Sequence, residues 1–559
     1  MACRNTVSIV ASIQIQKLHS IEKQSPPPER ISTYKPNIWK YDHLLSLTSQ
    51  YSEKKYKFEA LKLKEEVSSE FSESSVSPVG LLELIDKIDK LGLSACFEVE
   101  TKEALENTIL DSMKSNSSSK KEEDLYATAL CFRLLREHGY HASQDMLKDF
   151  FDGKGKLPSD INTLVELLEG SHLSMDGENL LNDIRLFSTK NLKNLSTSSD
   201  INRLTNNPLA WRVRWYDVRR HIISAQNCKN TNPMLLQLAK LNFNIIQATH
   251  QNDLKDVIRW WRNLCIVEDL DFTRDRIVES FFFAARIASE AQHGSMRKWL
   301  TKVIQLILII DDVYDIYGSL TEVQQFTRAI EKWDPKEVQK LPACIQICFR
   351  ALHDTMEEIS IEIQRQNDGP PTLPHLKQGW INFCKALLVE ATWYHKGHIP
   401  TLEEYLDNGW TSSSGQLLSF HVIFGLTNYK TTNETLDLCK NCQEIIYHTS
   451  VIIRLCNDQG TSTAELERGD VASSIICYMQ EENVSEDVAR EHIESIILNS
   501  WKKINYHFNT LSTSHQKIVK HVINEARMAH VMYHSGDGFG VQDGETQDQV
   551  LINLVEPLI

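Results

Sequence analysis

Two clusters of oxygen-bearing side chains in the second half of the chain have the chemistry of a divalent-metal site. The first is D-D-x-x-D from Asp311 to Asp315, and the second begins at Asn457 and includes Thr461 and Glu465. Residues four apart on a helix share a face, so each cluster presents its oxygens as a stripe. Carboxylate, amide and hydroxyl oxygens are hard ligands that suit Mg²⁺ or Mn²⁺ rather than zinc.

Three arginines stand where they could bind an anion held by such a site. Arg454 precedes Asn457 by one helical turn, and Arg274 and Arg276 flank Asp275. A guanidinium group can bind two phosphate oxygens at once through two parallel N–H donors. The chain carries a net charge of −15 and would repel a polyphosphate. Divalent ions and arginines at the site would make the local charge positive and so allow a polyphosphate to bind. Each feature alone is also compatible with a polar helix end, but together they predict a site for a metal-chelated diphosphate.

An apolar helix must position the first cluster. Residues 303–310 form the most apolar run of the chain and lead directly into Asp311. A helix this apolar is predicted to be buried, and its acidic C-terminal end then requires a compensating cation. Other segments also have helical apolar spacing, such as the stripe from Leu81 to Ile88, which Gly92 ends. The sequence lacks segments in which apolar and polar residues alternate between hairpin turns, as β-strands would show. The prediction is therefore an all-α fold.

Length and composition divide the chain and exclude some functions. At 559 residues, with only 21 Gly and 15 Pro, two domains built from long helices are expected. The polar stretch 226–233 predicts domains at 29–225 and 226–559. The acidic balance excludes a nucleic-acid binder, and no apolar run is long enough for a membrane span. Residues 1–28 are either a short transit peptide or a simple leader.

These motifs together resemble those of plant class I terpene synthases, in particular the monoterpene synthases of flowering plants. The resemblance extends from Arg30 to Ile559 and includes D-D-x-x-D, N-D-x-x-T-x-x-x-E from Asn457, R-x-R from Arg274 and the pair Trp260-Trp261. It implies two α-helical domains, of which the C-terminal one has the class I terpenoid synthase fold and the N-terminal one is vestigial. The N-terminal region has no D-x-D-D acid motif, so cyclisation initiated by protonation is not expected.

The resemblance also implies a role for each site residue. Three Mg²⁺ ions are expected, with Mn²⁺ as a substitute, and their ligands would be Asp311, Asp315, Asn457, Thr461 and Glu465. The catalytic group would comprise Asp311, Asp315, Arg274 and Arg276. The substrate would contact Arg274, Asp311, Asp315, Arg454, Asn457, Phe283 and Tyr533. Further candidates for the cavity wall are Ile304 and the helix break at 412–415, and the loop 534–538 has the composition of a lid.

The implied function is a lyase that ionises geranyl diphosphate and releases pyrophosphate and a monoterpene, acyclic or simply cyclic, or an alcohol if water captures the cation. The alternative is a sesquiterpene synthase acting on farnesyl diphosphate. More remote alternatives are a prenyl diphosphate elongase and a non-catalytic helical scaffold. A monomer is expected, and the plastid is favoured over the cytosol.

Two positions depart from the family pattern. The tandem arginine that often precedes the N-terminal Trp by ten residues is Glu29-Arg30 here, before Trp39. In the family this pair is associated with the route to cyclic monoterpenes, so cyclic products are in doubt. The position that often holds Trp, seven residues after Arg276, is Phe283, which offers a weaker π face to a carbocation. A changed product spectrum is therefore predicted.

Overall fold

The structure is a computed structural model that describes residues 36–72, 77–114, 122–151, 160–195, 199–228, 231–266, 270, 272–367, 371–427, 432–468, 472–534, 536–540, 542 and 544–559. Within these ranges the chain forms helices and no β-strand, as predicted. No helix in the described part is both long and apolar enough to cross a membrane. The predicted leader and Glu29-Arg30 lie outside the described residues.

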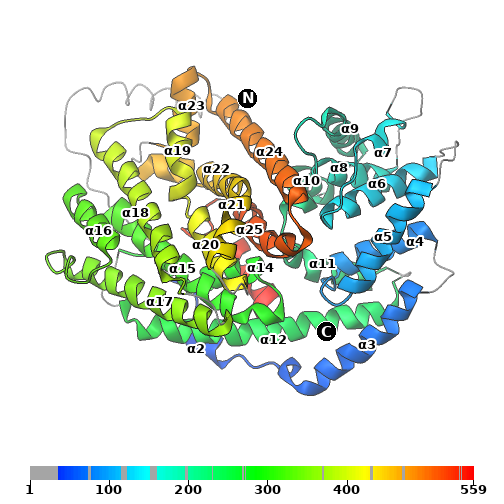
Figure 1. The fold of residues 1–559 in the computed structure, drawn as a ribbon, viewed down its shortest axis with the longest axis horizontal. Coiled ribbons are helices and arrows are strands. Elements are labelled where there is room, and N and C mark those ends of the chain that lie inside the picture. The colour runs from blue at the N-terminus through cyan, green and yellow to red at the C-terminus, as the bar shows by residue number, and fades with distance from the viewer. Residues whose placement is uncertain are drawn as a thin grey trace.

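The first half of the chain forms a group of mostly short helices. They are α2 (Tyr41–Ser46), α3 (Lys54–Ser72), α4 (Pro78–Lys90), α5 (Glu98–Lys114), α6 (Glu122–Glu137), α7 (Asp145–Lys148), α8 (Ile161–Ser171), α9 (Asn179–Leu195), α10 (Ser199–Asn206) and α11 (Arg214–Gln226). Figure 1 shows α4 to α10 gathered on one side of the molecule. Their apolar faces form a separate core that includes Leu82, Phe132 and Leu167.

The second half forms a larger helical bundle around an apolar centre (Figure 1). Its helices are α12 (Pro233–Asn263), α14 (Ile277–Ile287), α15 (Gly294–Asp312), α16 (Leu320–Lys332), α17 (Ala343–Asn367), α18 (Leu373–Lys396), α19 (Leu402–Ser412), α20 (Gly415–Leu426), α21 (Thr432–Asn441), α22 (Gln443–Arg468), α23 (Ser474–Glu482), α24 (Glu486–Thr510), α25 (Thr513–Met532) and α26 (Gly544–Val550). A π turn, η4 (Val313–Tyr317), follows α15, and a second, η5 (Leu551–Val555), follows α26.

The long helix α12 connects the two groups of helices. It begins where the polar stretch predicted a boundary, because the Asn232 side chain accepts hydrogen bonds from the first turn and Pro233 occupies the first helical position. It packs against α3 on one side and against α14 and α15 on the other. The end of the chain is bound to it, since Asn244 exchanges two 2.8 Å hydrogen bonds with the Leu558 backbone. The boundary at residue 226 stays a prediction.

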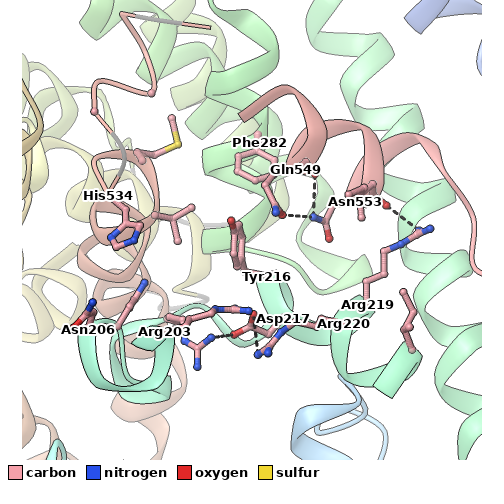
Figure 2. Close-up of a pocket in the computed structure, with 18 of the residues that line it drawn as sticks. Arg203, Asn206, Tyr216, Asp217, Arg219, Arg220, Phe282, His534, Gln549 and Asn553 are labelled. Carbon is pink, nitrogen blue, oxygen red and sulfur yellow. Dashed lines mark hydrogen bonds and ion pairs between the residues drawn. The ribbon is translucent and has the colours of Figure 1, made fainter. Parts of the chain in front are cut away.

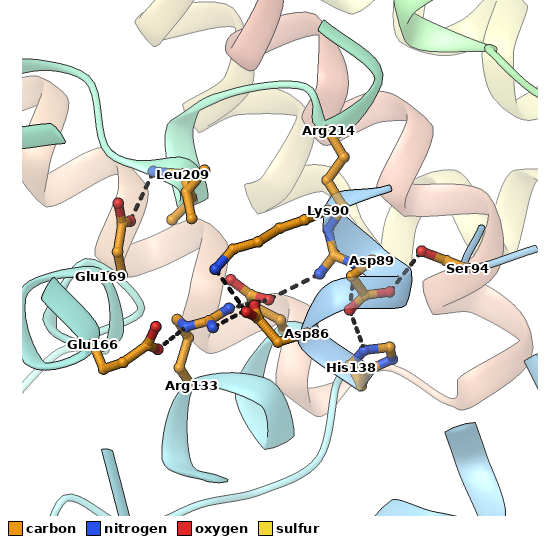
Figure 3. Close-up of polar contacts among 12 residues, drawn as sticks. Asp86, Asp89, Lys90, Ser94, Arg133, His138, Glu166, Glu169, Leu209 and Arg214 are labelled. Atoms are coloured by element: carbon orange, nitrogen blue, oxygen red, sulfur yellow. Dashed lines mark hydrogen bonds and ion pairs between the residues drawn. The ribbon is translucent and has the colours of Figure 1, made fainter. Parts of the chain in front are cut away.

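Several charged groups buried in the first group of helices pair with one another (Figure 3). The Arg133 guanidinium donates to Asp86 and Glu166 at 2.6 Å each. Asp89 accepts from the His138 ring and from the Arg214 guanidinium, 2.8 and 2.7 Å away, and thereby joins α4 to the residue that follows α6 and to α11. A buried arginine with several carboxylate partners is a structural ion network, so these acids hold helices together.

Candidate active site

The acidic end of α15 carries the cation that its burial requires. The apolar run 303–310 is buried, as predicted, between α14, α12, α17 and α20. The Arg274 guanidinium Nη2 lies 2.7 Å from Asp311 Oδ2 and 2.9 Å from Asp312 Oδ1. Because carboxylates at a helix C-terminus are unfavourable without a partner, Arg274 stabilises this end of the helix.

Asp312 is a site residue that the sequence interpretation passed over. Its carboxylate is fully buried and also accepts a 2.9 Å hydrogen bond from the Arg274 backbone N–H. Burial raises the pKa of Asp312 to about 6, with Arg274 acting against this rise and Asp311 adding to it. The spacing gave the signal, because a residue about 100° from Asp311 on an apolar helix must face the protein. Asp312 therefore positions Arg274, and Asp311 keeps a third of its side-chain surface exposed.

The π turn after α15 sets the place of Asp315. Residues 313–317 wind more widely than an α-helix, and the Gly318 N–H closes the turn on the Val313 carbonyl at 2.8 Å. Such π segments occur often at functional sites. Asp315 lies in this turn with a half-buried side chain. It therefore follows Asp311 by about one turn, as the prediction of a shared face requires.

The second cluster lies on α22, and the structure describes most of it. The Thr461 hydroxyl donates to the Asn457 carbonyl at 2.8 Å, which uses its proton and leaves its oxygen lone pairs available. The buried Asp458 carboxylate accepts from the Tyr405 hydroxyl and the Ser474 N–H, both at 2.9 Å, and so anchors α22 to α19 and α23. The Glu465 side chain lies outside the described residues, although its backbone belongs to α22.

Glu390 and Tyr533 each lie near both Asp311 and Arg454. Burial raises the pKa of the Glu390 carboxyl on α18, Arg454 opposes this rise, and Asp311 adds to it. Burial also raises the pKa of the Tyr533 hydroxyl, which the charge of Asp311 increases and those of Arg274 and Arg454 reduce. Side chains from α15, α22, α18 and the end of α25 thus act on one another electrostatically. The structure brings Asp311, Arg274 and Arg454 near one another, and the prediction that Asn457, Thr461 and Glu465 face the same space stays a prediction.

The predicted helix break lies beside Arg454 and contacts its guanidinium group. α19 ends at Ser412 and α20 begins at Gly415, with Ser414 in the left-handed region at a φ of 65°. The Arg454 Nη2 donates to Ser412 Oγ at 2.7 Å and lies 3.4 Å from Glu390 Oε1. A side chain at Gly415 would collide with Ser450 on α22. The break therefore lets α20 approach α22 closely and holds the guanidinium in place.

Asp275, which lies between the two predicted arginines, binds residues near the beginning of the described chain. The Asp275 carboxylate accepts hydrogen bonds from Asn37, from the Tyr41 hydroxyl and from the Trp261 indole. Residues 37–41 thereby lie against the segment that carries Arg274. The sequence predicted neither Asp275 nor this segment, since a contact across more than 200 residues leaves no local pattern.

Arg276 is turned toward the C-terminal loop. Its side chain is 1% exposed, and its Nε donates to the Phe539 carbonyl at 2.8 Å. The Glu279 carboxylate nearby accepts from the Trp39 indole and the Gln542 amide, both at 2.7 Å. Arg276 thus positions the loop that follows Tyr533, and its direct part in the reaction stays a prediction.

The predicted lid loop packs on the second cluster. Gly460 on α22 lies so close to Tyr533 that a Cβ there would come within 2.8 Å of the Tyr533 carbonyl oxygen. Gly536 has a φ of 122°, which only glycine adopts easily, and Ser535 lies outside the described residues. Closure of this loop stays a prediction.

The predicted wall residues on α14 and α15 are buried. Phe283 is 5% exposed with its ring centre 6.0 Å from that of Phe539, and Ile304 is 4% exposed. These two residues lie on helices that pack against each other. They supply the apolar surroundings that a reactive cation needs, and their contact with a substrate stays a prediction.

One further group in the described part of the chain could hold a metal. Glu290, His293 and His521 place one ligand atom each within 4.8 Å of one another. Lys520 Nζ already lies 3.3 Å from Glu290 Oε1, and His521 Nδ1 bonds the Ile287 carbonyl at 2.7 Å. The carboxylate thus has an ammonium partner, and we interpret this group as a structural contact between α25 and the start of α15.

The donor set fits a hard divalent cation. Asp311, Asp315, Asn457 and Thr461 offer oxygen ligands, and the Asp311 carboxylate is partly exposed. Arg274 and Arg454 border the same space with guanidinium groups suited to phosphate oxygens. The arrangement can therefore hold a metal-chelated diphosphate beside buried apolar side chains.

Comparison with known proteins agrees with this geometry. Residues 38–214 match the terpene synthase N-terminal domain, and residues 262–503 match the metal-binding domain of the terpene synthase family. The chain is 48% identical to an alpha-farnesene synthase of Ricinus communis, over 94% of this chain and 95% of that protein. The chain belongs to the terpene synthase family.

Solved structures define the fold and the class of reaction. Limonene synthase with 2-fluorolinalyl diphosphate is similar with a TM-score of 0.90 and 37% identity, over 95% of this chain and all of that chain. Isoprene synthase from grey poplar leaves, with three Mg²⁺ ions and dimethylallyl-S-thiolodiphosphate, has a TM-score of 0.83 and 35% identity, over 94% and 99%. The predicted two-domain helical fold is confirmed. The protein is a carbon–oxygen lyase that acts on a prenyl diphosphate.

Proposed function

We propose that the protein ionises a prenyl diphosphate and releases pyrophosphate and an acyclic terpene. The observation that carries the proposal is the convergence of Asp311, Arg274, Arg454 and Tyr533 on one space next to buried apolar side chains. Three Mg²⁺ ions, when bound, would neutralise the departing diphosphate. Asp311 and Asp315 would hold two of them, and Asn457, Thr461 and Glu465 the third.

The chain's own residues would orient the substrate and exclude water. Arg274, held by Asp312, and Arg454, held by Ser412 and Glu390, would bind diphosphate oxygens, where charge develops as the bond breaks. The allylic chain would then lie against Phe283 among buried side chains. This exclusion of water matters because water captures a carbocation. Departure of a proton from the cation would give the olefin.

The length of the substrate is the finer part of the proposal. The sequence favoured geranyl diphosphate, but the Ricinus relative at 48% identity is named for farnesene, a terpene of fifteen carbons. This name favours farnesyl diphosphate as the substrate. Geranyl diphosphate is the second candidate, because the chain is also similar, with a TM-score of 0.90, to a limonene synthase that holds 2-fluorolinalyl diphosphate. An acyclic product agrees with the Glu29-Arg30 departure. A monomer stays our proposal.

Localisation follows the substrate question. A geraniol synthase of Cinnamomum tenuipile, 40% identical over 95% of this chain and 89% of that protein, is named chloroplastic. If geranyl diphosphate is the substrate, this relative supports a plastid protein. If farnesyl diphosphate is the substrate, we favour the cytosol.

Product analysis tests the proposal. The full chain is supplied separately with farnesyl and geranyl diphosphate, in Mg²⁺, in Mn²⁺ or in EDTA, and pyrophosphate and volatile products are measured. We expect metal-dependent release of an acyclic olefin, lost in Asp311→Ala and unchanged in Asp437→Ala, whose carboxylate is exposed on α21. Isopentenyl diphosphate incorporated into the product would instead identify an elongase, and an inactive but folded wild type would leave a scaffold.

A further inference from the structure

The part of α22 that carries the second cluster is held by several neighbouring elements. Asn457, Thr461 and Glu465 follow one another at intervals of four residues and so form one stripe along the helix. Asp458 anchors one side of this segment to α19 and α23. Because a small divalent ion demands a nearly fixed ligand geometry, the other sides of the segment must be held as well.

One of these sides lies against a loop that borders a cavity. Gly460 packs on the loop that follows Tyr533, and this loop also lines a cavity of about 860 Å³ between the two groups of helices. Figure 2 shows His534 of the loop on one wall of the cavity and Arg203 meeting Asp217 on another wall. Close packing is what fixes a segment in place, and the loop has space behind it. The loop alone therefore gives α22 little support.

Arg490 on α24 supplies firm support from another side. Its Nη1 donates to the Gln459 carbonyl at 3.0 Å, and its Nη2 donates to Ser462 Oγ at 2.8 Å. With 3.6 residues per turn, Gln459 and Ser462 lie about 160° and about 100° around the helix from Thr461. Arg490 therefore binds the face of α22 that is turned away from the ligand stripe.

The guanidinium group is itself held in place. Its Nε donates to Glu486 Oε1 at 2.9 Å, one turn earlier on α24. A guanidinium group is planar and its donors have fixed directions, so two bonds to one helix set both the position and the rotation of that helix. The two bonds reach residues 459 and 462, which lie on either side of Thr461 and Gly460 along the chain.

We propose that Arg490 is a positioning residue for the metal ligands of the second cluster. It holds residues 459–462 of α22 so that Asn457 and Thr461 keep the geometry that a bound ion requires. This role rests on the proposed function, in which Asn457, Thr461 and Glu465 hold the third ion.

A role of this kind can be distinguished from an effect of charge. A cation near the cluster repels a divalent ion, so the removal of the Arg490 charge alone would strengthen metal binding. The loss of positioning weakens metal binding instead. The sign of the change in affinity therefore separates the two effects.

Mn²⁺ binding to the full chain tests this role without turnover. Mn²⁺ is titrated in the presence of inorganic diphosphate, and electron paramagnetic resonance measures the bound ions. We expect wild type to bind three ions and Arg490→Gln to bind one of the three about tenfold more weakly, with the other two unchanged. Arg490→Lys keeps the charge but not the paired donors, so it should also weaken that ion.

Glu486→Gln is the matched control. It removes the ion pair within α24 and leaves both bonds from Arg490 to α22, so it should bind Mn²⁺ like wild type. The Arg490 side chain is 29% exposed, which favours folding of its variants. Melting curves identify any variant that fails to fold, and Arg490→Lys serves if Arg490→Gln does.

Hydrogen exchange in EDTA gives a second measurement that needs no metal. The amides of residues 459–466 should exchange about tenfold faster in Arg490→Gln than in wild type, while those of α15 keep the wild-type rate. Unchanged exchange at 459–466 would show that Arg490 does not hold this segment and would overturn the proposal.

The Mn²⁺ titration can also overturn it. Equal affinity for all three ions in Arg490→Gln and wild type would do so, and so would tighter binding in Arg490→Gln, which would assign the guanidinium an effect of charge alone. If wild type itself bound no Mn²⁺, the metal site of the proposed function would fail together with this role. Three ions bound equally by wild type and Arg490→Gln would remove only the role of Arg490.

Discussion

The contact between residues 37–41 and Asp275 can be tested by one isosteric substitution, Asp275→Asn. The carboxylate accepts from Asn37 Nδ2 at 3.0 Å, from the Tyr41 hydroxyl and from the Trp261 indole at 2.9 Å. A hydrogen bond to a charged acceptor contributes about 1 kcal/mol more than one to a neutral acceptor. The Trp261 bond does not join residues 37–41 to Asp275, so this segment loses the strength of two such bonds, about 2 kcal/mol in total. Since about 1.4 kcal/mol is a factor of ten, the docked state of residues 37–41 should become about 30-fold less favoured.

Hydrogen exchange measures this shift directly. The amides of residues 37–46 should exchange about 30-fold faster in Asp275→Asn, while those of α12 should be unaffected. Turnover should fall with docking, because Asp275 lies between Arg274 and Arg276. The matched control is Asp42→Asn, which removes one charge from the same segment but only an exposed ion pair with Arg262 at 2.9 Å. Such a pair contributes about 0–1 kcal/mol.

Two results would refute the reasoning. If exchange in residues 37–46 were unchanged in Asp275→Asn, the bonds from Asn37 and Tyr41 would not hold this segment. If Asp42→Asn accelerated exchange as much, the effect would be one of general charge and would not come from the Asp275 site.

Three further substitutions give distinct expectations. Phe283→Trp should change the ratio of products, measured by gas chromatography, and an unaltered profile and rate would exclude contact with the cation. Gly460→Ala should lower turnover by displacing the loop at Tyr533, and it should also lower the melting temperature, because overpacking against backbone costs about 1–3 kcal/mol; wild-type turnover would contradict this. Burial raises the pKa of the Glu169 carboxyl from 4.5 to about 7. The folded state therefore binds this proton more tightly than the unfolded state, and the free energy of unfolding of the wild type falls as the pH rises from 4.5 to about 7. Glu169→Gln removes the loss and should gain up to about 3 kcal/mol over wild type between pH 4.5 and 8 in urea unfolding; a difference independent of pH would contradict the assignment.

Local patterns predicted the helices and their ends well. The apolar stripe 81–88 became α4, and Gly92 adopts a φ of 73° just after it. The helix break at 412–415 and the start of α12 at Pro233 also match the prediction. These features depend on spacing and on the intrinsic properties of Gly, Pro and Asn, which a sequence displays directly.

The partners of the site residues could not be predicted in the same way. Arg276 bonds the Phe539 carbonyl across 263 positions, and Asp275 bonds Asn37 across 238. Such pairs depend on how helices pack, and no local pattern records them. Arg276 shows the consequence, because its spacing indicated a part in the reaction, which stays a prediction, and gave no sign that its Nε donates to the Phe539 carbonyl.

The same limit applies to the arginines that meet at Asp217. Arg203, Arg212 and Arg220 are spread over 18 positions among ordinary helical residues, and only the fold directs them to one carboxylate. Hydrophobic packing alone does not account for them, because burying Arg212 without hydrogen bonds opposes folding. Arg212 keeps an ion pair with Asp217 at 2.8 Å, and this contact offsets part of the cost of its burial.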